Sequence, residues 1–348
     1  MKKILIVISI LILFTITAFS ETKIDSLEAI LKSVSGTDKT KILEKLATAY
    51  SRSGNYSKAI QLLEQIVEIH NQIGYAEKSG KIYQKLGQSC FKIGDYDKSL
   101  VYHTKALVSN QASGNRKREA RNLSDIGYVH KTIGDYDKAI SYYQQGLKIS
   151  EELNDEENTA LTLNRIGSTY VVIDDYEKAL DYYQTSLEIR KKIDDKQGIA
   201  GSFNNIGLVY LKYEQYDKAL EYYFKALKIN EEMGNLHWKS FNLNNIGDTY
   251  EVLGKYEKAL DYYFRSLKIK EDRNDKRGIV FTLGNISTVY FNLGKAKLAI
   301  DYYLKSLMLA RKIGLKQQVL QCYLDLSELY SAIKDYKSAL EYKNLYTT

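Results

Sequence analysis

Residues 242–275 decide the fold of this chain, with the sequence NLNNIGDTYEVLGKYEKALDYYFRSLKIKEDRND. Nearly everything after residue 20 repeats this pattern every 40 residues, and no insertion interrupts the interval from about residue 39 onward. A fixed period of this length indicates a repeat protein, in which each repeat packs against the next. One position is small in all repeats: Ala47, Gly87, Gly127, Gly167, Gly207, Gly247, Ser287 and Ser327.

Apolar residues recur at helical spacing in two blocks of each repeat, which predicts two amphipathic helices per repeat. A left-handed glycine is expected to end the first helix, as at Gly254 before Lys255. Glu214 and Lys334 replace that glycine in two repeats, so looser turns are expected there. The apolar positions of residues 242–275 are Leu243, Ile246, Tyr250 and Leu253, then Tyr256, Ala259, Leu260, Tyr263 and Leu267.

The spacing of Leu243, Ile246-Gly247, Tyr250, Ala259 and Tyr263 resembles the tetratricopeptide repeat (TPR). The resemblance covers residues 39–348 in eight repeats, the last one short. It implies an all-α fold, a right-handed α-α superhelical solenoid of about eight helical hairpins. The period is 40 residues and the chain has no proline, whereas the usual repeat has about 34 residues and a closing proline. This chain is therefore most similar to the long-helix subclass of kinesin light chains and Pins-type adaptors, in an exported bacterial form.

Residues 1–20 have the pattern of a secretory signal peptide. Lys2 and Lys3 precede an apolar run, and the small residues Ala18 and Ser20 stand at the minus-three and minus-one positions of a cut after Ser20. The protein is therefore expected to be exported by a bacterium, to the periplasm or the medium. An uncleaved membrane anchor is the alternative interpretation.

Residues 21–38 are predicted to form an N-terminal capping helix, with Ile24, Leu27 and Leu31 on its apolar face. A terminal repeat lacks a neighbour on one side, so a covering helix is physically expected. The solenoid itself is predicted to span residues 39–348.

The net charge argues against a nucleic-acid partner, and the motifs argue against catalysis. Without the two lysines of residues 1–20, Lys+Arg falls from 50 to 48 against Asp+Glu 43, a net charge of about +5. No basic stripe recurs from repeat to repeat, so no nucleic-acid partner is expected. The four histidines and two cysteines show no metal-ligand spacing, and no phosphate loop or nucleophile elbow is present. We therefore expect no enzymatic activity, no metal and no cofactor.

Several conspicuous residues are better explained by packing than by chemistry. Cys90, His103 and His130 each replace a tyrosine of the repeat, and Cys90 is expected to be a buried thiol. Cys90 and Cys322 lie six repeats apart, too far to form a disulfide in an extended array. The chain contains 31 tyrosines, many in pairs at one repeat position, which indicates core packing.

The candidate binding residues come from the resemblance. In TPR proteins the first helices line the concave surface, and residues just before the repeat glycine point into the groove. In the long-helix adaptors, asparagines there hold the backbone of an extended peptide, since one amide both donates and accepts. The alternative is that these asparagines only bridge adjacent helices. The six predicted peptide-binding residues are Asn164, Asn204 and Asn244, with Asn205, Asn245 and Asn285 beside them.

The predicted function is an exported, non-catalytic scaffold that binds an extended segment of a partner protein. The alternative is the extracytoplasmic sensory region of a membrane receptor, of the histidine kinase or helix-turn-helix regulator type, truncated at its C-terminus. Such a receptor would continue past Thr348 into an apolar run of about 20 residues. A membrane is expected to be involved only in that case or if the signal is uncleaved. A third interpretation is a spacer within an envelope assembly.

Overall fold

The computed structural model describes residues 24–75 and 79–347, and these form helices and turns without a strand. The predicted signal peptide, residues 1–20, lies outside the described residues. The chain divides into two compact parts, Met1–Ile173 and Asp174–Thr348, which we call the N-terminal half and the C-terminal half. Across the described residues no helix combines the length and apolar character needed to cross a membrane.

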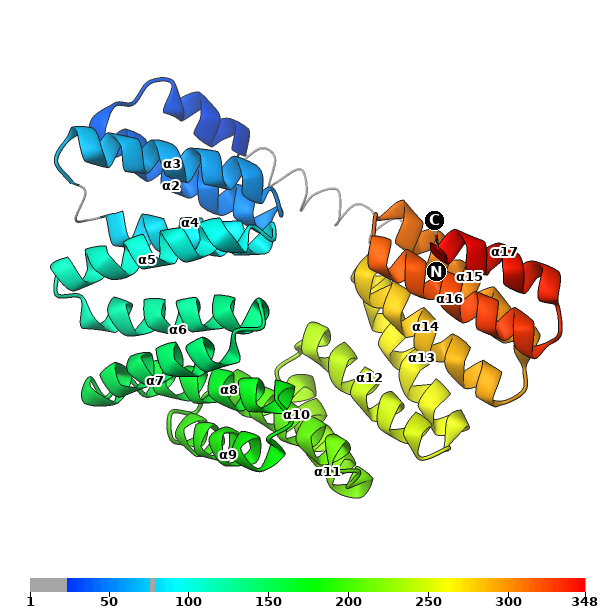
Figure 1. Cartoon of the computed structure of the whole chain (residues 1–348). Helices are drawn as coiled ribbons and strands as arrows, with labels where there is room; N and C mark the ends of the chain where they lie inside the picture. Colours follow the sequence, from blue (N-terminus) through cyan, green and yellow to red (C-terminus); the bar gives the residue numbers. More distant parts are fainter. Residues whose placement is uncertain (1–23, 76–78, 348) are drawn as a thin grey trace. The chain divides into compact units, whose positions relative to one another are not determined.

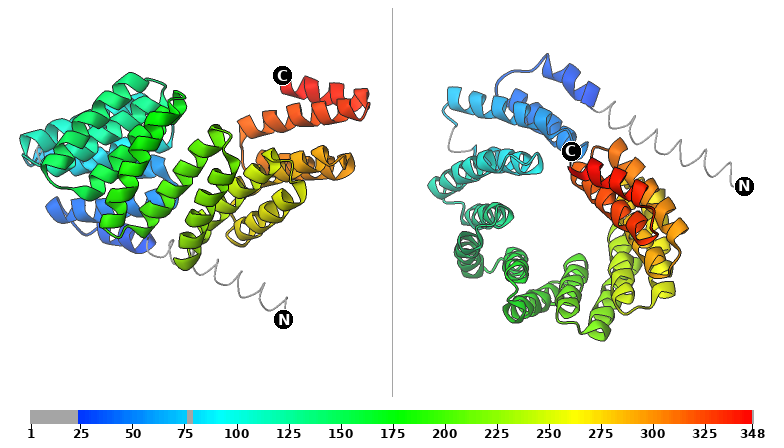
Figure 2. Two further views of the ribbon diagram at one scale, coloured as in Figure 1. Left: turned by 90° about the horizontal axis from the view of Figure 1, so that it is seen from below. Right: turned by 45° about the vertical axis from the view of Figure 1, so that its right-hand side comes forward.

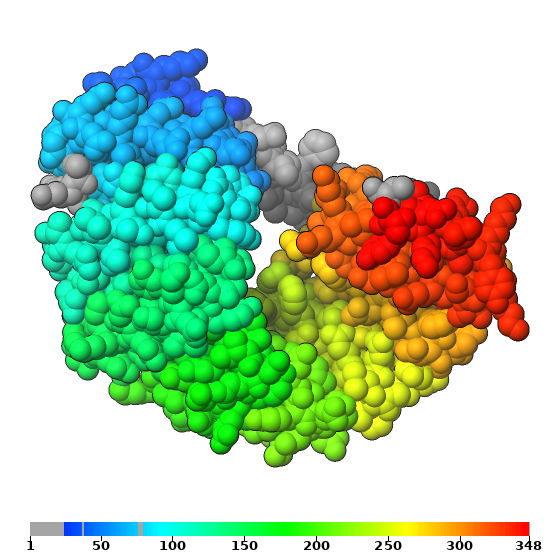
Figure 3. Space-filling view, viewed as in Figure 1, coloured from blue at the N-terminus to red at the C-terminus, as the bar shows by residue number. Residues whose placement is uncertain are grey.

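In the N-terminal half, a short helix over residues 24–31 precedes seven longer helices, and consecutive helices pack against each other in chain order (Figures 1 and 3). These seven are α2 (Gly36–Arg52), α3 (Tyr56–Gln72), α4 (Gly80–Lys92), α5 (Tyr96–Ala112), α6 (Arg116–Thr132), α7 (Tyr136–Glu152) and α8 (Glu156–Val172).

The C-terminal half continues with the same arrangement of paired helices (Figure 2). The predicted all-α solenoid of helical hairpins is thereby confirmed. The helices of this half are α9 (Tyr176–Lys192), α10 (Lys196–Lys212), α11 (Tyr216–Glu232), α12 (Leu236–Val252), α13 (Tyr256–Asp272), α14 (Lys276–Asn292), α15 (Ala296–Lys312), α16 (Lys316–Ala332) and α17 (Tyr336–Thr347).

The turns inside the hairpins share one geometry, which corrects the expectation of looser turns at Glu214 and Lys334. Gly254 has φ +68°, and its amide donates to the Glu251 carbonyl at 2.9 Å. Glu214 adopts φ +57° and its amide donates to the Leu211 carbonyl at 3.0 Å, so the same bond forms without glycine. The helix-ending hydrogen bond holds Glu214 in the left-handed region at a cost of roughly 1–2 kcal/mol, which is absent for glycine.

The core is a row of tyrosines packed on the small repeat position. A Cβ added to Gly247 would lie 2.7 Å from the ring of Tyr263, so only glycine lets the ring approach this closely. Tyr143, Tyr183 and Tyr223 occupy the same repeat position and are also fully buried. These tyrosines therefore serve packing, as their spacing predicts.

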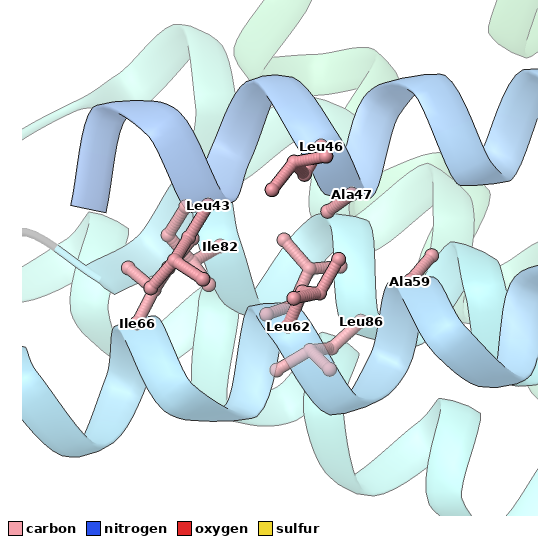
Figure 4. Close-up of a cluster of buried hydrophobic side chains, with 9 residues drawn as sticks. Leu43, Leu46, Ala47, Ala59, Leu62, Ile66, Ile82 and Leu86 are labelled. Atoms are coloured by element: carbon pink, nitrogen blue, oxygen red, sulfur yellow. The ribbon is translucent and has the colours of Figure 1, made fainter. Parts of the chain in front are cut away.

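The first repeats are covered by the helix over residues 24–31. Ile24, Leu27 and Leu31 pack against the apolar cluster of α2, α3 and α4, and the Tyr50 hydroxyl donates to Glu28 Oε1 at 2.7 Å. Figure 4 shows side chains of this cluster pointing toward one another from three helices, among them Leu43, Ile66 and Ile82.

Candidate functional site: a polar network on the first helices

Side-chain hydrogen bonds join the first helices of successive hairpins in the C-terminal half. Asn204 Oδ1 on α10 accepts from Asn245 Nδ2 on α12 at 2.8 Å and from Asn242 Nδ2 at 3.1 Å. Asn285 Nδ2 on α14 donates to Asp248 Oδ1 on α12 at 2.9 Å. We call the surface formed by α10, α12 and α14 the C-terminal first-helix face.

Four of the predicted asparagines take part in this network. They differ in which side-chain donors and acceptors remain without a partner in the described part of the protein. Asn244 is fully used: Nδ2 donates to the Asp248 carboxylate at 3.2 Å, and Oδ1 lies 3.2 Å from the Thr282 hydroxyl. No hydrogen-bond partner within the described residues is found for Asn204 Nδ2, Asn245 Oδ1 or Asn285 Oδ1. These three half-buried groups remain able to bind a ligand.

The other two predicted asparagines also lie on first helices. Asn164 is half-buried on α8, in the N-terminal half, and Asn205 is half-buried on α10. The structure thus places helix-bridging hydrogen bonds on Asn204, Asn244, Asn245 and Asn285, while contact with a peptide stays a prediction for all six.

Sequence reasoning missed the buried half of the network. Asn230 Nδ2 on α11 donates to Asn242 Oδ1 at 2.7 Å, and these side chains are 3% and 1% exposed. The signal for Asn242 was present, because the first two repeats have Ile42 and Ile82 at the same position. An amide at a core position needs a buried partner, and the preceding helix α11 supplies it.

A tyrosine hydroxyl joins two acidic residues of α12. Tyr263 Oη lies 2.6 Å from Asp248 Oδ1 and 2.7 Å from Glu251 Oε2. Burial raises the pKa of Asp248 and of Glu251, although the hydrogen bond from Tyr263 opposes this in both. A phenol has one hydrogen to donate, so Tyr263 can donate to only one of the two carboxyl groups at a time.

Lys270 on α13, the second helix of the same hairpin as α12, also takes part in the network. The side chain is 3% exposed, and Nζ donates to the Thr282 hydroxyl at 2.6 Å. Burial lowers the pKa of Lys270 to about 8, against the attraction of Asp275 and Asp248. Its Nζ also lies 5.6 Å from the centroid of the Phe241 ring, a cation–π distance.

An exposed aromatic cluster lies beside this network on α12. The Phe241 ring centroid is 4.9 Å from that of His237 and 5.6 Å from that of Trp238. Trp238 and Phe241 are 41% and 39% exposed, and Phe281, at the Phe241 position of the next repeat, is 41% exposed. This part of the face combines amide groups with accessible apolar rings.

The first helices of the N-terminal half are bridged by charges instead. Glu44 on α2 accepts from Lys81 and Lys85 on α4, at 2.7 and 2.9 Å. Arg165 Nη1 on α8 lies 3.1 Å from Asp125 Oδ1 on α6. One scaffold therefore carries different side-chain chemistry on the first helices of its two halves.

The residues that the sequence assigned to packing are buried or stacked. His103 is 2% exposed, and a Cβ at Gly87 would lie 2.6 Å from its ring. His130 stacks on Tyr142 with centroids 5.4 Å apart. Cys90 is a free, buried thiol, and burial raises its pKa to about 11. Within the described residues, no three His, Cys, Asp or Glu side chains are grouped so as to hold a metal ion.

Comparison with known proteins identifies the repeat. A tetratricopeptide repeat profile matches residues 38–107, 78–152, 118–192, 158–232, 198–272 and 279–346. A comparison with curated proteins gave no match.

Three solved structures show a similar fold. The apo form of the quorum sensor NprR from B. thuringiensis has a TM-score of 0.67 at 18% identity, over 93% of this chain and 91% of that one. Aspartyl phosphate phosphatase F from Bacillus subtilis has a TM-score of 0.64 at 15% identity, over 94% and 93%. A Rap protein complexed with Competence and Sporulation Factor has a TM-score of 0.61 at 17% identity, over 94% and 90%. At these identities the likeness concerns the fold alone.

Proposed function

The chain belongs to the tetratricopeptide repeat family, and from this premise we propose that it is a non-catalytic scaffold that binds an extended segment of a partner protein. The fold is typical of protein–protein interaction scaffolds, and proteins of this family are generally non-catalytic. The C-terminal first-helix face is the surface to which we assign the binding.

The observation that carries the proposal is the set of amide groups left over by the network. Asn204 Nδ2, Asn245 Oδ1 and Asn285 Oδ1 come from three adjacent first helices, α10, α12 and α14. A partner backbone that crosses these helices would meet a donor or an acceptor on each. Such contacts do not depend on the partner's side chains, so they suit an extended segment of varied sequence.

The aromatic rings beside the network supply apolar contact area, which the amide groups do not provide. Exposed aromatic side chains contribute much of the binding energy in protein interfaces, whereas single amide contacts contribute little net free energy. Trp238, Phe241 and Phe281 are therefore assigned as the apolar anchors of the same segment.

Binding can be tested with peptides selected from a displayed random library, with Trp238 fluorescence as the readout. Phe241→Ala is expected to weaken a selected peptide about tenfold or more. Asn285→Ala should weaken it less, by about two- to tenfold, and helicity by circular dichroism should be retained in both variants. The matched control is Gln184→Ala, an exposed amide on the second helix α9, which should bind as the parent does. Equal affinity of all these variants would overturn the assignment of the face.

We also propose that the scaffold is exported to the periplasm or the medium, as the pattern of residues 1–20 predicts. The test is the N-terminal sequence of the protein recovered from fractionated bacterial cells. A chain beginning at Glu21 in the periplasmic fraction or the medium supports export with cleavage. A chain that retains residues 1–20 in the membrane fraction would instead favour the anchored alternative.

The sensory alternative is tested separately, by reading the gene past the codon for Thr348. An open frame that enters an apolar run of about 20 residues would favour a receptor region, and a stop codon would favour the free scaffold.

A further inference from the structure

A cavity of about 330 Å³ opens between α2 and α4 in the N-terminal half. Ala47 and the buried Leu63 of α3 form its apolar part, and Thr48 and Ser51 line it from α2. The volume is at the small end of the range for small-molecule sites, roughly 300–1,000 Å³. The cavity is separate from the C-terminal first-helix face.

The cavity exists because the first repeat lacks the core tyrosine. Leu63 stands at the repeat position of Tyr263. In the later repeat, the Tyr263 hydroxyl reaches Asp248 and Glu251, the residues equivalent to Thr48 and Ser51. Leucine is shorter and carries no hydroxyl, so the corresponding space is left open.

A second substitution matches the first. Ala47 replaces the repeat glycine, and its methyl group fits because no tyrosine ring lies there. In the later repeat a Cβ at Gly247 would lie 2.7 Å from the Tyr263 ring. Ala47 and Leu63 therefore stand where the later repeat has glycine and tyrosine, and both line the cavity.

The lining combines positive charge with hydroxyl groups, of which that of Thr48 is already bonded: it donates to the Glu44 carbonyl at 2.8 Å and accepts from Lys85 Nζ at 3.1 Å. Arg52 and Lys92 occupy the same position in successive repeats, and neither has an ion-pair partner among the described residues. The described residues that line the cavity include no acidic side chain, and Lys85, which also lines it, is paired with Glu44. Ser89 is 5% exposed and lines the cavity, yet no hydrogen-bond partner within the described part of the chain is found for its hydroxyl.

We propose that this cavity binds a compact anion with an apolar body, whose carboxylate or phosphate is held by Arg52 and Lys92. The guanidinium of arginine presents paired donors that match either group. The Ser89 and Ser51 hydroxyls donate to the same head group, and the apolar body contacts the half-buried Tyr56, which also lines the cavity. The ligand can be a free small molecule or an acidic or phosphorylated side chain of a partner.

The direct test is isothermal titration calorimetry on the full chain, with phenyl phosphate and phenylacetate as probes. Saturable binding of at least one probe is expected, and the Arg52→Gln/Lys92→Gln variant should weaken it more than tenfold. Lys212→Gln is the matched control, because Lys212 is exposed at the equivalent position of α10 in the C-terminal half. Absence of binding by the parent protein would overturn the proposal.

A second variant tests the cavity rather than the charge. Ala47→Gly/Leu63→Tyr restores the pair found in the later repeats, fills the space with a ring and keeps all the basic residues. Probe binding should be lost while the helical content is retained. If this variant does not fold, the Arg52→Gln/Lys92→Gln variant alone tests the site. Probe affinity equal to that of the parent, in either variant that folds, refutes the site.

The source of the anion is distinguished by a further comparison. Short peptides that carry phosphotyrosine or glutamate are titrated beside the free probes. Tighter binding of a peptide assigns the cavity to a partner side chain, and equal or weaker binding assigns it to a free molecule; binding of either kind that depends on Arg52 supports the proposal.

Discussion

Replacing Lys270 with methionine is expected to remove a pH-dependent part of the folding stability. The side chain is 3% exposed, and burial lowers its pKa from 10.5 to about 8. The folded state then holds this proton more weakly than the unfolded state does, so the charged form opposes folding below pH 8. At roughly 1.36 kcal/mol per pKa unit, the cost of the charge at pH 7 is about 3 kcal/mol.

The sign of the pH dependence follows from the lowered pKa. As the pH rises from 8 to 10.5, the parent protein loses this cost and gains up to about 3 kcal/mol relative to the Lys270→Met variant. The absolute difference at one pH also contains the lost hydrogen bond to Thr282, so only the change of the difference with pH is diagnostic.

The assay is urea unfolding of both proteins between pH 7 and 10.5, followed by the fluorescence of Trp238, which lies in the same half. Tyrosines and other groups that titrate in both proteins cancel in the difference. Lys268→Met is the control, because Lys268 is 72% exposed and its variant should give a flat difference. A difference that is also flat for Lys270→Met would refute the reasoning, since the ammonium would then keep an ordinary pKa.

Four further substitutions test the packing and the turns. Tyr263→Phe should destabilise by about 1–3 kcal/mol, more at pH 7 than at pH 5, because ionised carboxyl groups lose their donor; urea unfolding at both pH values checks this. Gly247→Ala should destabilise by about 1–3 kcal/mol through its clash with the tyrosine ring, whereas Gly284→Ala, with no atom within 4 Å of the added Cβ, should stabilise by about 0.5–1 kcal/mol. Glu214→Gly should stabilise by about 1 kcal/mol by relieving the left-handed backbone, and equal melting temperatures would contradict this.

The fold could be predicted because every repeat gives the same information. A small residue, a tyrosine and an alanine at fixed spacing define one packing unit, and eight copies average out the exceptions. Residue preference alone predicts a looser turn at Glu214, but the hydrogen bonds that end the helix determine the geometry of the turn. Those bonds form equally well at Gly254 and Glu214.

The site could be predicted only in part. The repeat register places Asn204, Asn244 and Asn285 on first helices, but their hydrogen-bond partners come from other helices, such as Lys270 on α13. Which of two neighbouring amides donates to the other depends on side-chain orientation across a helix interface. The register of the repeat does not contain this information.

The residue at the repeat position of Tyr263 controls what the neighbouring first helix can offer to a partner. Where a tyrosine meets polar residues, as Tyr263 meets Asp248, the first-helix group is satisfied internally. Where it meets Leu208, as in the preceding repeat, the Tyr223 hydroxyl is buried without a partner in the described part of the chain. Where the tyrosine is absent, at Leu63, the first-helix hydroxyl of Thr48 bonds to Glu44 and Lys85 of the first helices, and Ser51 lines a cavity. Variation at one core position thus changes the chemistry of the surface while leaving the hairpin unchanged.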